Sequence, residues 1–258
     1  MNSADLHVHT PASDGSDSVR KRVEDADDKG LDAIAITDHD AVNSDLDERV
    51  YVDEETGVEV ITGAEIKCEV EDTGIEILGY FLDPQSPEIS TLLQRNSELR
   101  EERIQEMISN LNEVMDYSLE EDEVFSRVQG NPGRPHIAEA LVEADEVEDV
   151  QTQNDAFDKY IGEDCPAYIP TPKRDAEEVI DTVRQEGGVP VLAHPGRDLT
   201  EENAGELVCE LVDYGLEGIE VLYSWEHKKR NDFGVDFAEH KSRELAEEYN
   251  LIWTGGSD

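Results

Sequence analysis

The sequence predicts an α/β fold, with a parallel sheet that is interrupted near the middle of the chain by a helical segment. Short apolar runs alternate with polar amphipathic segments, which is the pattern of strands joined by helices. From about residue 84 to residue 164 these runs give way to apolar residues at helical spacing. With 258 residues, 37% of them hydrophobic, the chain is long enough for one large domain with an insertion.

Local signals support the individual elements. Residues 18–29 follow an Asp-Gly-Ser turn and stop at Gly30, and residues 175–186 stop at Gly187, so both segments are predicted helices. The short apolar runs that are predicted to be strands are residues 4–9, 32–37, 58–66, 75–81, 189–193, 218–222 and 251–255.

The insertion is expected to be a helical cap subdomain at residues 85–164, on a discontinuous main domain formed by residues 1–84 and 165–258. Within it, the Pro- and Gly-rich loop 130–135 breaks one helix and leads into another at about residues 136–143.

Acidic residues dominate the composition, with 65 Asp or Glu against 21 Lys or Arg and a formal charge of −44. Such a surface excludes binding of long DNA or RNA through surface charge. The excess is spread over the chain and resembles that of haloarchaeal proteins, which work in molar salt that screens charge within about 3 Å. An ordinary acidic protein is the alternative.

The cysteines and the apolar runs bear on the cellular setting. Cys68, Cys165 and Cys209 are widely spaced and form no CxxC pair, so they indicate neither a disulfide framework nor a cysteine zinc site. They are predicted to be small core residues. No apolar stretch approaches the roughly 18 residues that span a bilayer, and residues 1–5 lack the features of a signal peptide. A cytoplasmic protein is therefore expected.

The first predicted strand ends in a pair of histidines. His7 and His9 flank one residue, so both side chains project from one face of the strand and can chelate a metal ion. An isolated pair of this kind is more often two surface histidines. Further polar groups, however, follow other predicted strands: Asp14, His39, Glu65, His194 and Asp258.

The residue types at these strand ends point to a metal centre. Active sites of barrels and open α/β sheets collect at the carboxyl ends of the strands. Imidazole with carboxylate and without thiolate suits zinc, manganese or iron. Asp14 taken alone could equally be a helix cap or part of an Asx turn.

In order along the chain, these motifs resemble the PHP family, named for polymerase and histidinol phosphatase. The family's members are metal-dependent phosphoesterases on a distorted (β/α)7, TIM-like barrel. Residues 100–104, 133–138 and 156–161 resemble the branch that hydrolyses 3′,5′-nucleoside bisphosphates or trims RNA from the 5′ end. The motifs are HxH at 7–9, SDG at 13–15, TDHD at 37–40, GAE at 63–65, RPHIA at 134–138, AHPG at 193–196 and GGSD at 255–258.

The resemblance implies two to three divalent ions, Mn, Zn or Fe. They would generate a metal-bound hydroxide that attacks phosphorus, with no side-chain nucleophile. The implied ligands are His7, His9, Glu65 and Asp258 for one ion, Glu65 and His194 for a second, and Asp14 and His39 for a third.

The chain departs from the family pattern at two places. Glu76 stands where a metal-binding His is expected, so it is either a carboxylate ligand, which favours manganese or magnesium, or a surface residue on a weakened site. The family continues after GGSD with a further His. Either the sequence is a fragment that stops at Asp258 or the third site is incomplete.

Three residues of the insertion are candidates for substrate binding: Arg103, Arg134 and His136. A guanidinium group donates two parallel hydrogen bonds to a phosphate. The alternative for Arg103 is a surface ion pair with an acidic neighbour such as Glu106.

The sequence thus favours a hydrolase for a small phosphorylated substrate, either a nucleotide or a short RNA. Histidinol phosphatase is the alternative within the same class. The alternative from another class is a non-catalytic PHP module that binds a partner, which Glu76 and the missing final His would favour.

Overall fold

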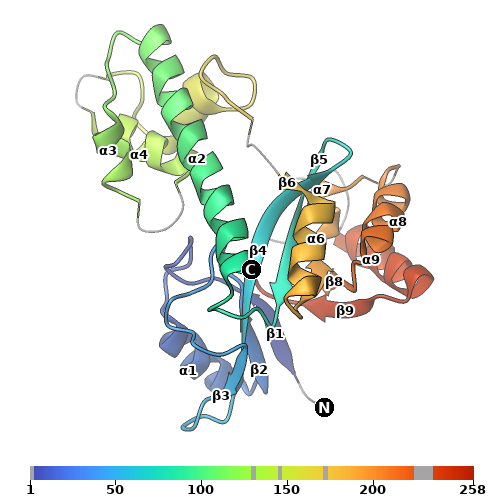
Figure 1. Cartoon of the computed structure of the whole chain (residues 1–258). Coiled ribbons are helices and arrows are strands. Elements are labelled where there is room, and N and C mark those ends of the chain that lie inside the picture. The colour runs from blue at the N-terminus through green and yellow to red at the C-terminus, as the bar shows by residue number, and fades with distance from the viewer. Residues whose placement is uncertain (1–2, 129–131, 145–146, 171–173, 201, 224–234) are drawn as a thin grey trace. The chain divides into compact units, whose positions relative to one another are not determined.

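The structure is a computed structural model that describes residues 3–128, 132–144, 147–170, 174–200, 202–223 and 235–258 (Figure 1). The chain divides into two compact units, one formed by Met1–Gln94 with Lys173–Asp258 and the other by Arg95–Pro172. Helix α2 (Pro87–Val114) begins in the first unit and continues into the second. The division between the units therefore falls inside a helix.

The first unit is built on a sheet whose strands follow a nearly closed path. Within the described residues, the order along this path is β1, β2, β4, β5, β7, β8, β9. After β9 the chain returns to β1, where the N–H of Asp258 donates to the carbonyl of His7 at 2.9 Å. The predicted α/β fold with a barrel-like sheet is confirmed. The strands span Ala4–Val8 (β1), Ala33–Ile36 (β2), Glu59–Val70 (β4), Thr73–Tyr80 (β5), Val189–Leu192 (β7), Gly218–Leu222 (β8) and Ile252–Gly255 (β9).

The centre of the path is antiparallel, in contrast to its two ends. β5 pairs antiparallel with both β4 and β7, so the predicted parallel arrangement is wrong here. The turn between β4 and β5 has left-handed backbone at Glu71 (φ 44°) and Asp72 (φ 64°), which matches the twist of a hairpin. Two short strands that pair with β4 were not predicted: β3 (Val50–Val52) and β6 (Arg174–Asp175).

Both helices predicted for the first unit are present. α1 (Val19–Lys29) starts at the N-cap Ser18 and stops at Gly30, whose φ of 71° is readily adopted only by glycine. α6 (Ala176–Gln185) starts at the N-cap Asp175. The other helices described in this unit, besides the start of α2, are α7 (Pro195–Asp198), α8 (Ala204–Tyr214) and α9 (Val235–Tyr249).

Apolar side chains from both faces of the sheet are buried. Residues of α6, α8 and α9 share one core with β4, β5, β7 and β8, and α1 packs on the residues of β1 and β2 that face it. On the opposite face of the strands lies a separate cluster that includes Ala35, Leu78, Tyr80 and Val191. Ala193, the residue just before His194, also belongs to this second cluster.

The second unit is helical, and its described residues include no strand. Besides most of α2, it contains α3 (Glu121–Phe125), α4 (Arg134–Glu143), α5 (Gln153–Ala156) and a π-helical turn, η1 (Phe157–Ile161). It has its own apolar core, formed in part by Ile104, Met107, Leu111, Ile137 and Leu141. Residues 130 and 131 of the predicted loop lie outside the described residues.

The three cysteines do not share one environment. Cys68 is fully buried in β4, as predicted. The prediction is wrong for Cys165, which is only partly buried, and for Cys209, which is exposed on α8. α8 buries the stripe formed by Ala204, Leu207, Val208 and Leu211, and position 209 lies outside that stripe. Among the described helices, none is both long enough and apolar enough to cross a membrane.

Candidate metal centre

The predicted ligands of the first unit converge on one buried carboxylate, Glu65 in β4. Its side chain is inaccessible to solvent. His194 Nε2 lies 2.8 Å and His7 Nε2 3.4 Å from Glu65 Oε1. His39 Nδ1 lies 2.7 Å and His9 Nε2 3.5 Å from Glu65 Oε2. Four imidazoles from the ends of three strands thus surround both oxygens of one glutamate.

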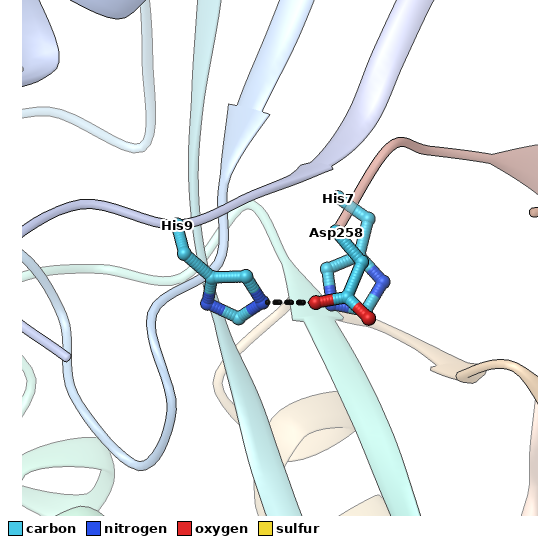
Figure 2. Close-up of side chains that lie close together, drawn as sticks. All are labelled: His7, His9 and Asp258. Atoms are coloured by element: carbon cyan, nitrogen blue, oxygen red, sulfur yellow. Dashed lines mark ion pairs between the residues drawn. The ribbon is translucent and has the colours of Figure 1, made fainter. Parts of the chain in front are cut away.

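Local structure brings these side chains together. His7 lies within β1 and His9 directly after it, so they project from the same face. His39 follows β2 and forms an isolated parallel bridge with Glu65. The segment after β9 returns to β1, and Figure 2 shows the ring of His9 pointing to the carboxylate of Asp258, with His7 beside it. The distance from His9 Nε2 to Asp258 Oδ1 is 3.1 Å.

The side chains form three overlapping groups, in each of which the potential ligand atoms lie within 4.8 Å of one another. The first and second groups share His9, and the second and third share Glu65, so the centre is continuous. The groups found among the described residues are His7, His9 and Asp258; His9, His39 and Glu65; and Glu65, Glu76 and His194.

The donor atoms fit a cation better than they fit one another. His7 Nε2, His9 Nε2 and Glu65 Oε2 are buried and make no hydrogen bond of good geometry to other described residues. Buried polar atoms are nearly always satisfied, so such atoms need a partner. Nitrogen and oxygen atoms that converge in this way are satisfied by a shared divalent ion.

Asp14 and Glu76 differ in their burial and in their distance from the centre. Asp14 belongs to none of the three groups, and 68% of its side chain is exposed. Its carboxylate oxygens lie 3.8 Å from His9 Nδ1 and 3.7 Å from His39 Nε2, close to the centre but outside it. Glu76 is buried and belongs to the third group, with Oε2 3.2 Å from His194 Nε2. The structure therefore places Glu76 in the centre and not on the surface.

The centre is strongly acidic, and this changes the protonation of its histidines. Burial lowers the pKa of His7, but the charges of Glu65 and Glu220 outweigh this effect and raise it to about 10. The pKa of His39 is raised to about 9, because Glu65 and Glu76 outweigh burial in the same way. Burial would raise the pKa of Glu65, yet the charges of His39 and His7 hold it well below its usual value. These shifts favour the protonated form of His7 and His39 when no metal ion is bound.

Other acidic residues near the strand ends have structural roles. The carboxylate of Asp38 accepts hydrogen bonds from the N–H and hydroxyl of Thr10 and from the hydroxyl of Ser13, each at 2.7 Å. Asp40 accepts the N–H of Lys67 at 3.0 Å. Two carboxylates of the TDHD motif therefore hold the loops that carry the ligands.

The sequence analysis missed a second layer of carboxylates behind the histidines. Glu220 in β8 is fully buried and lies 3.2 Å from His7 Nδ1, and Asp198 lies 3.2 Å from His194 Nδ1. The signal for Glu220 was an acidic residue inside the apolar strand 218–222. Such a residue is almost never buried without a partner. Asp198 carried no comparable signal, because acidic residues are common throughout the chain.

The candidate substrate residues lie in the second unit. The guanidinium groups of Arg103 and Arg134 both lie over the ring of Tyr168, at 5.7 and 5.3 Å from its centroid. Arg103 is buried and its Nε donates to the carbonyl of Ile169 at 2.7 Å, so it is no surface ion pair with Glu106. The ring of His136 hydrogen-bonds to the backbone of Gly133 and caps α4.

The family is decided by comparison with known proteins. The profile of the PHP domain family matches residues 5–183, which is more than half of the chain. The chain belongs to the PHP domain family. The predicted resemblance is thereby confirmed.

Several curated proteins are similar to this PHP chain over nearly its whole length. A 5′-3′ exoribonuclease of Haemophilus influenzae is 30% identical, covering 98% of this chain and 88% of its own. A 3′,5′-nucleoside bisphosphate phosphatase of Chromobacterium violaceum is 28% identical, covering 100% and 87%. A phosphoribosyl 1,2-cyclic phosphate 1,2-diphosphodiesterase of Eggerthella lenta is 30% identical, covering 98% and 92%.

A solved structure supports the same assignment. A protein from Bifidobacterium adolescentis, described as a metal-dependent phosphoesterase, is 30% identical and has a TM-score of 0.75, with 99% of this chain and 86% of its own covered. Taken with the His, Glu and Asp groups, these similarities establish the class of activity. This PHP protein is a metal-dependent phosphoesterase, a hydrolase of phosphoric ester bonds.

Proposed function

We propose that this protein hydrolyses a small nucleotide, either a 3′,5′-nucleoside bisphosphate or the 5′ end of a short RNA. The observation that carries the proposal is the continuous centre of three ligand groups that share His9 and Glu65. When bound there, divalent ions would activate water and neutralise charge on the phosphoryl oxygens. The similarity to the exoribonuclease and to the bisphosphate phosphatase supports the substrate class.

We assign the ligands in two to three positions. Metal identity is proposed from the donor set, which is imidazole and carboxylate without thiolate and so suits Mn, Zn or Fe. Glu76 makes the third group richer in carboxylate, which favours Mn there. Asp14 is proposed to turn toward the ion that His39 holds. The proposed ligands are His7, His9, Asp14, His39, Glu65, Glu76, His194 and Asp258.

The paired arginines are proposed to bind an anionic group of the substrate. Burial and the charge of Arg134 lower the pKa of Arg103 to about 10. Among the described residues, neither guanidinium forms an ion pair, and Arg103 Nη2 is buried without a hydrogen bond. Two like charges that share the ring of Tyr168 are stabilised by an anion between them, and a phosphate accepts their paired hydrogen bonds.

The acidic surface is proposed to be an adaptation to concentrated KCl inside a salt-accumulating cell. The formal charge of −44 arises from an excess of acidic residues, and the 65 Asp and Glu residues are distributed over both units. In molar salt the repulsion between exposed carboxylates is largely screened. Attraction of an anionic substrate is then left to the metal centre and to the two arginines, of which Arg103 is buried.

The substrate assignment is tested by hydrolysis in molar KCl with Mn²⁺. Adenosine 3′,5′-bisphosphate and a short 5′-phosphorylated RNA are compared with histidinol phosphate and with a ribose 1,2-cyclic phosphate. We expect the highest kcat/KM for one of the first two compounds. Faster hydrolysis of either comparison compound would contradict the substrate class. Absence of turnover of all four by a metal-loaded protein would favour a non-catalytic binding module.

A further inference from the structure

One buried carboxylate contacts two of the proposed ligands from behind. Glu220 lies in the middle of β8, and its side chain is inaccessible to solvent. Its Oε1 lies 3.2 Å from His7 Nδ1, and its Oε2 accepts the backbone N–H of His194 at 2.8 Å. An ionised side chain is costly to bury unless its oxygens are hydrogen-bonded. Here both oxygens have a donor, and each donor belongs to a ligand.

The first contact fixes the ring of His7. When Nδ1–H donates to Glu220, the lone pair of Nε2 is left for an ion. Nε2 points to Glu65 Oε1 at 3.4 Å, and within the described part of the chain it makes no hydrogen bond of good geometry. The carboxylate therefore selects the tautomer and the orientation that His7 needs as a ligand.

The second contact fixes the backbone of His194. This residue has φ 23° and ψ 57°, a left-handed conformation that is unfavourable for a residue with a side chain. The hydrogen bond from its N–H to Glu220 stabilises that conformation, which directs Nε2 to Glu65 (2.8 Å) and Glu76 (3.2 Å). The rings of His7 and His194 lie stacked, 5.7 Å apart.

We propose that Glu220 is a positioning residue that couples the two ends of the metal centre. His7 belongs to the group with His9 and Asp258, whereas His194 belongs to the group with Glu65 and Glu76. A change at Glu220 therefore disturbs ligands of two ions at once. The inference rests on the proposed function only in treating these two histidines as ligands.

The test is the Glu220→Gln variant, titrated calorimetrically with Mn²⁺ or Zn²⁺ alone. Glutamine has nearly the same shape but offers one acceptor oxygen to two donors, and its NH₂ group faces one of them. We expect the affinity at two binding steps to fall about tenfold to hundredfold. The absorption spectrum of the Co²⁺-loaded protein should also change, because it reports the number and geometry of the ligands.

Two matched variants sharpen the test. Asp198→Asn changes a carboxylate whose one ion pair with a proposed ligand, among the described residues, is that with His194, so it should weaken one binding step only. Glu217→Gln, just before β8, changes a partly exposed carboxylate that pairs with Arg184 at 3.5 Å and should leave ion binding unchanged. Wild-type affinities and an unchanged Co²⁺ spectrum in folded Glu220→Gln would overturn the inference. Absence of ion binding by the wild type would instead overturn the proposed function.

Glu220→Asp keeps the charge and both acceptor oxygens but shortens the side chain by one methylene. If Glu220→Gln fails to fold, this variant is titrated in its place, and we expect weakened binding at both steps and a Co²⁺ spectrum that differs from that of the wild type. If the role of Glu220 were only structural, the variant would have a lower thermal unfolding midpoint, and the Co²⁺ spectrum of the folded variant would equal that of the wild type. That result would likewise overturn the inference.

Discussion

Each unit contains a cluster of charged side chains, and the two clusters differ in the sign of their excess charge. In the first unit, carboxylates surround histidines, and the pKa of His7 is raised to about 10. In the second unit, two arginines share one tyrosine ring, and the pKa of Arg103 is lowered to about 10. A bound cation stabilises a cluster with excess negative charge, and a bound anion stabilises a cluster with excess positive charge. The difference supports the proposal that the first cluster binds cations and the second an anion.

The largest effect is expected from Glu65, which contacts four imidazoles. Glu65→Ala should lower kcat/KM by about a thousandfold or more, because the proposed ions lose the carboxylate that their groups share. His9→Ala should act similarly. Steady-state hydrolysis of the best substrate measures the effect, with Glu59→Ala at the exposed start of β4 as the control. Retention of more than a tenth of the activity in Glu65→Ala would break the account of the first cluster.

A smaller and different effect is expected from the arginines. Arg103→Met or Arg134→Met should raise KM about tenfold to hundredfold, as expected for loss of a charge-assisted hydrogen bond, with a smaller change in kcat. The matched control is Arg127→Met, which removes an exposed pair with Glu143 in the same unit. Metal affinity should be unchanged in all three variants. If either arginine variant changes metal binding but not KM, the second cluster does not serve an anion.

The raised histidine pKa values predict how metal binding depends on pH. In the metal-free protein, stabilisation by protonated His7 and His39 is fully present below the unfolded pKa of 6.5 and is lost as pH rises through about 9 to 10. Ions compete with these protons, so metal affinity should rise over this range. Calorimetry in buffers of different ionisation enthalpy measures the protons that binding releases near pH 7. Binding without proton release would contradict the charge state assigned to the centre.

The smallest expected effect is that of salt concentration, which acts more on exposed charges than on buried ones. Raising KCl to molar concentration should increase the thermal unfolding midpoint, because salt screens repulsion among exposed carboxylates. The relative affinities of the arginine variants should change much less, since buried charges are screened less. A midpoint that falls or stays constant with KCl would contradict the proposed adaptation to salt.

Much of the fold could be predicted because its signals are local. Apolar runs bounded by glycine and polar turns identified the strands of the sheet, and Ser18 and Gly30 marked the ends of α1. The direction of β5 could not be predicted, because an apolar run has no polarity that distinguishes parallel from antiparallel pairing. Local signals identify elements, whereas pairing depends on contacts between distant segments.

The candidate site was predictable to the extent that its residues lie at strand ends. His9 and His194 lie just after β1 and β7 and converge for that reason, whereas Glu65 lies within the long strand β4, beyond the end of its neighbour β2. The structure leaves Asp14 exposed beside the centre and buries Glu76 within it, which turn geometry and cross-strand packing decide. Glu220 escaped notice because its role depends on a contact with His7, which lies 213 positions away in the chain.

The central claim is that the first unit holds two or more divalent ions that catalyse phosphoester hydrolysis. It is tested most directly by the metal content of the full chain after loading with Mn²⁺ or Zn²⁺ and removal of unbound ions, with Glu65→Ala in parallel. We predict two or more ions per chain in the wild type and less than one in the variant. Less than one ion per wild-type chain, or equal content in the two proteins, would contradict the account.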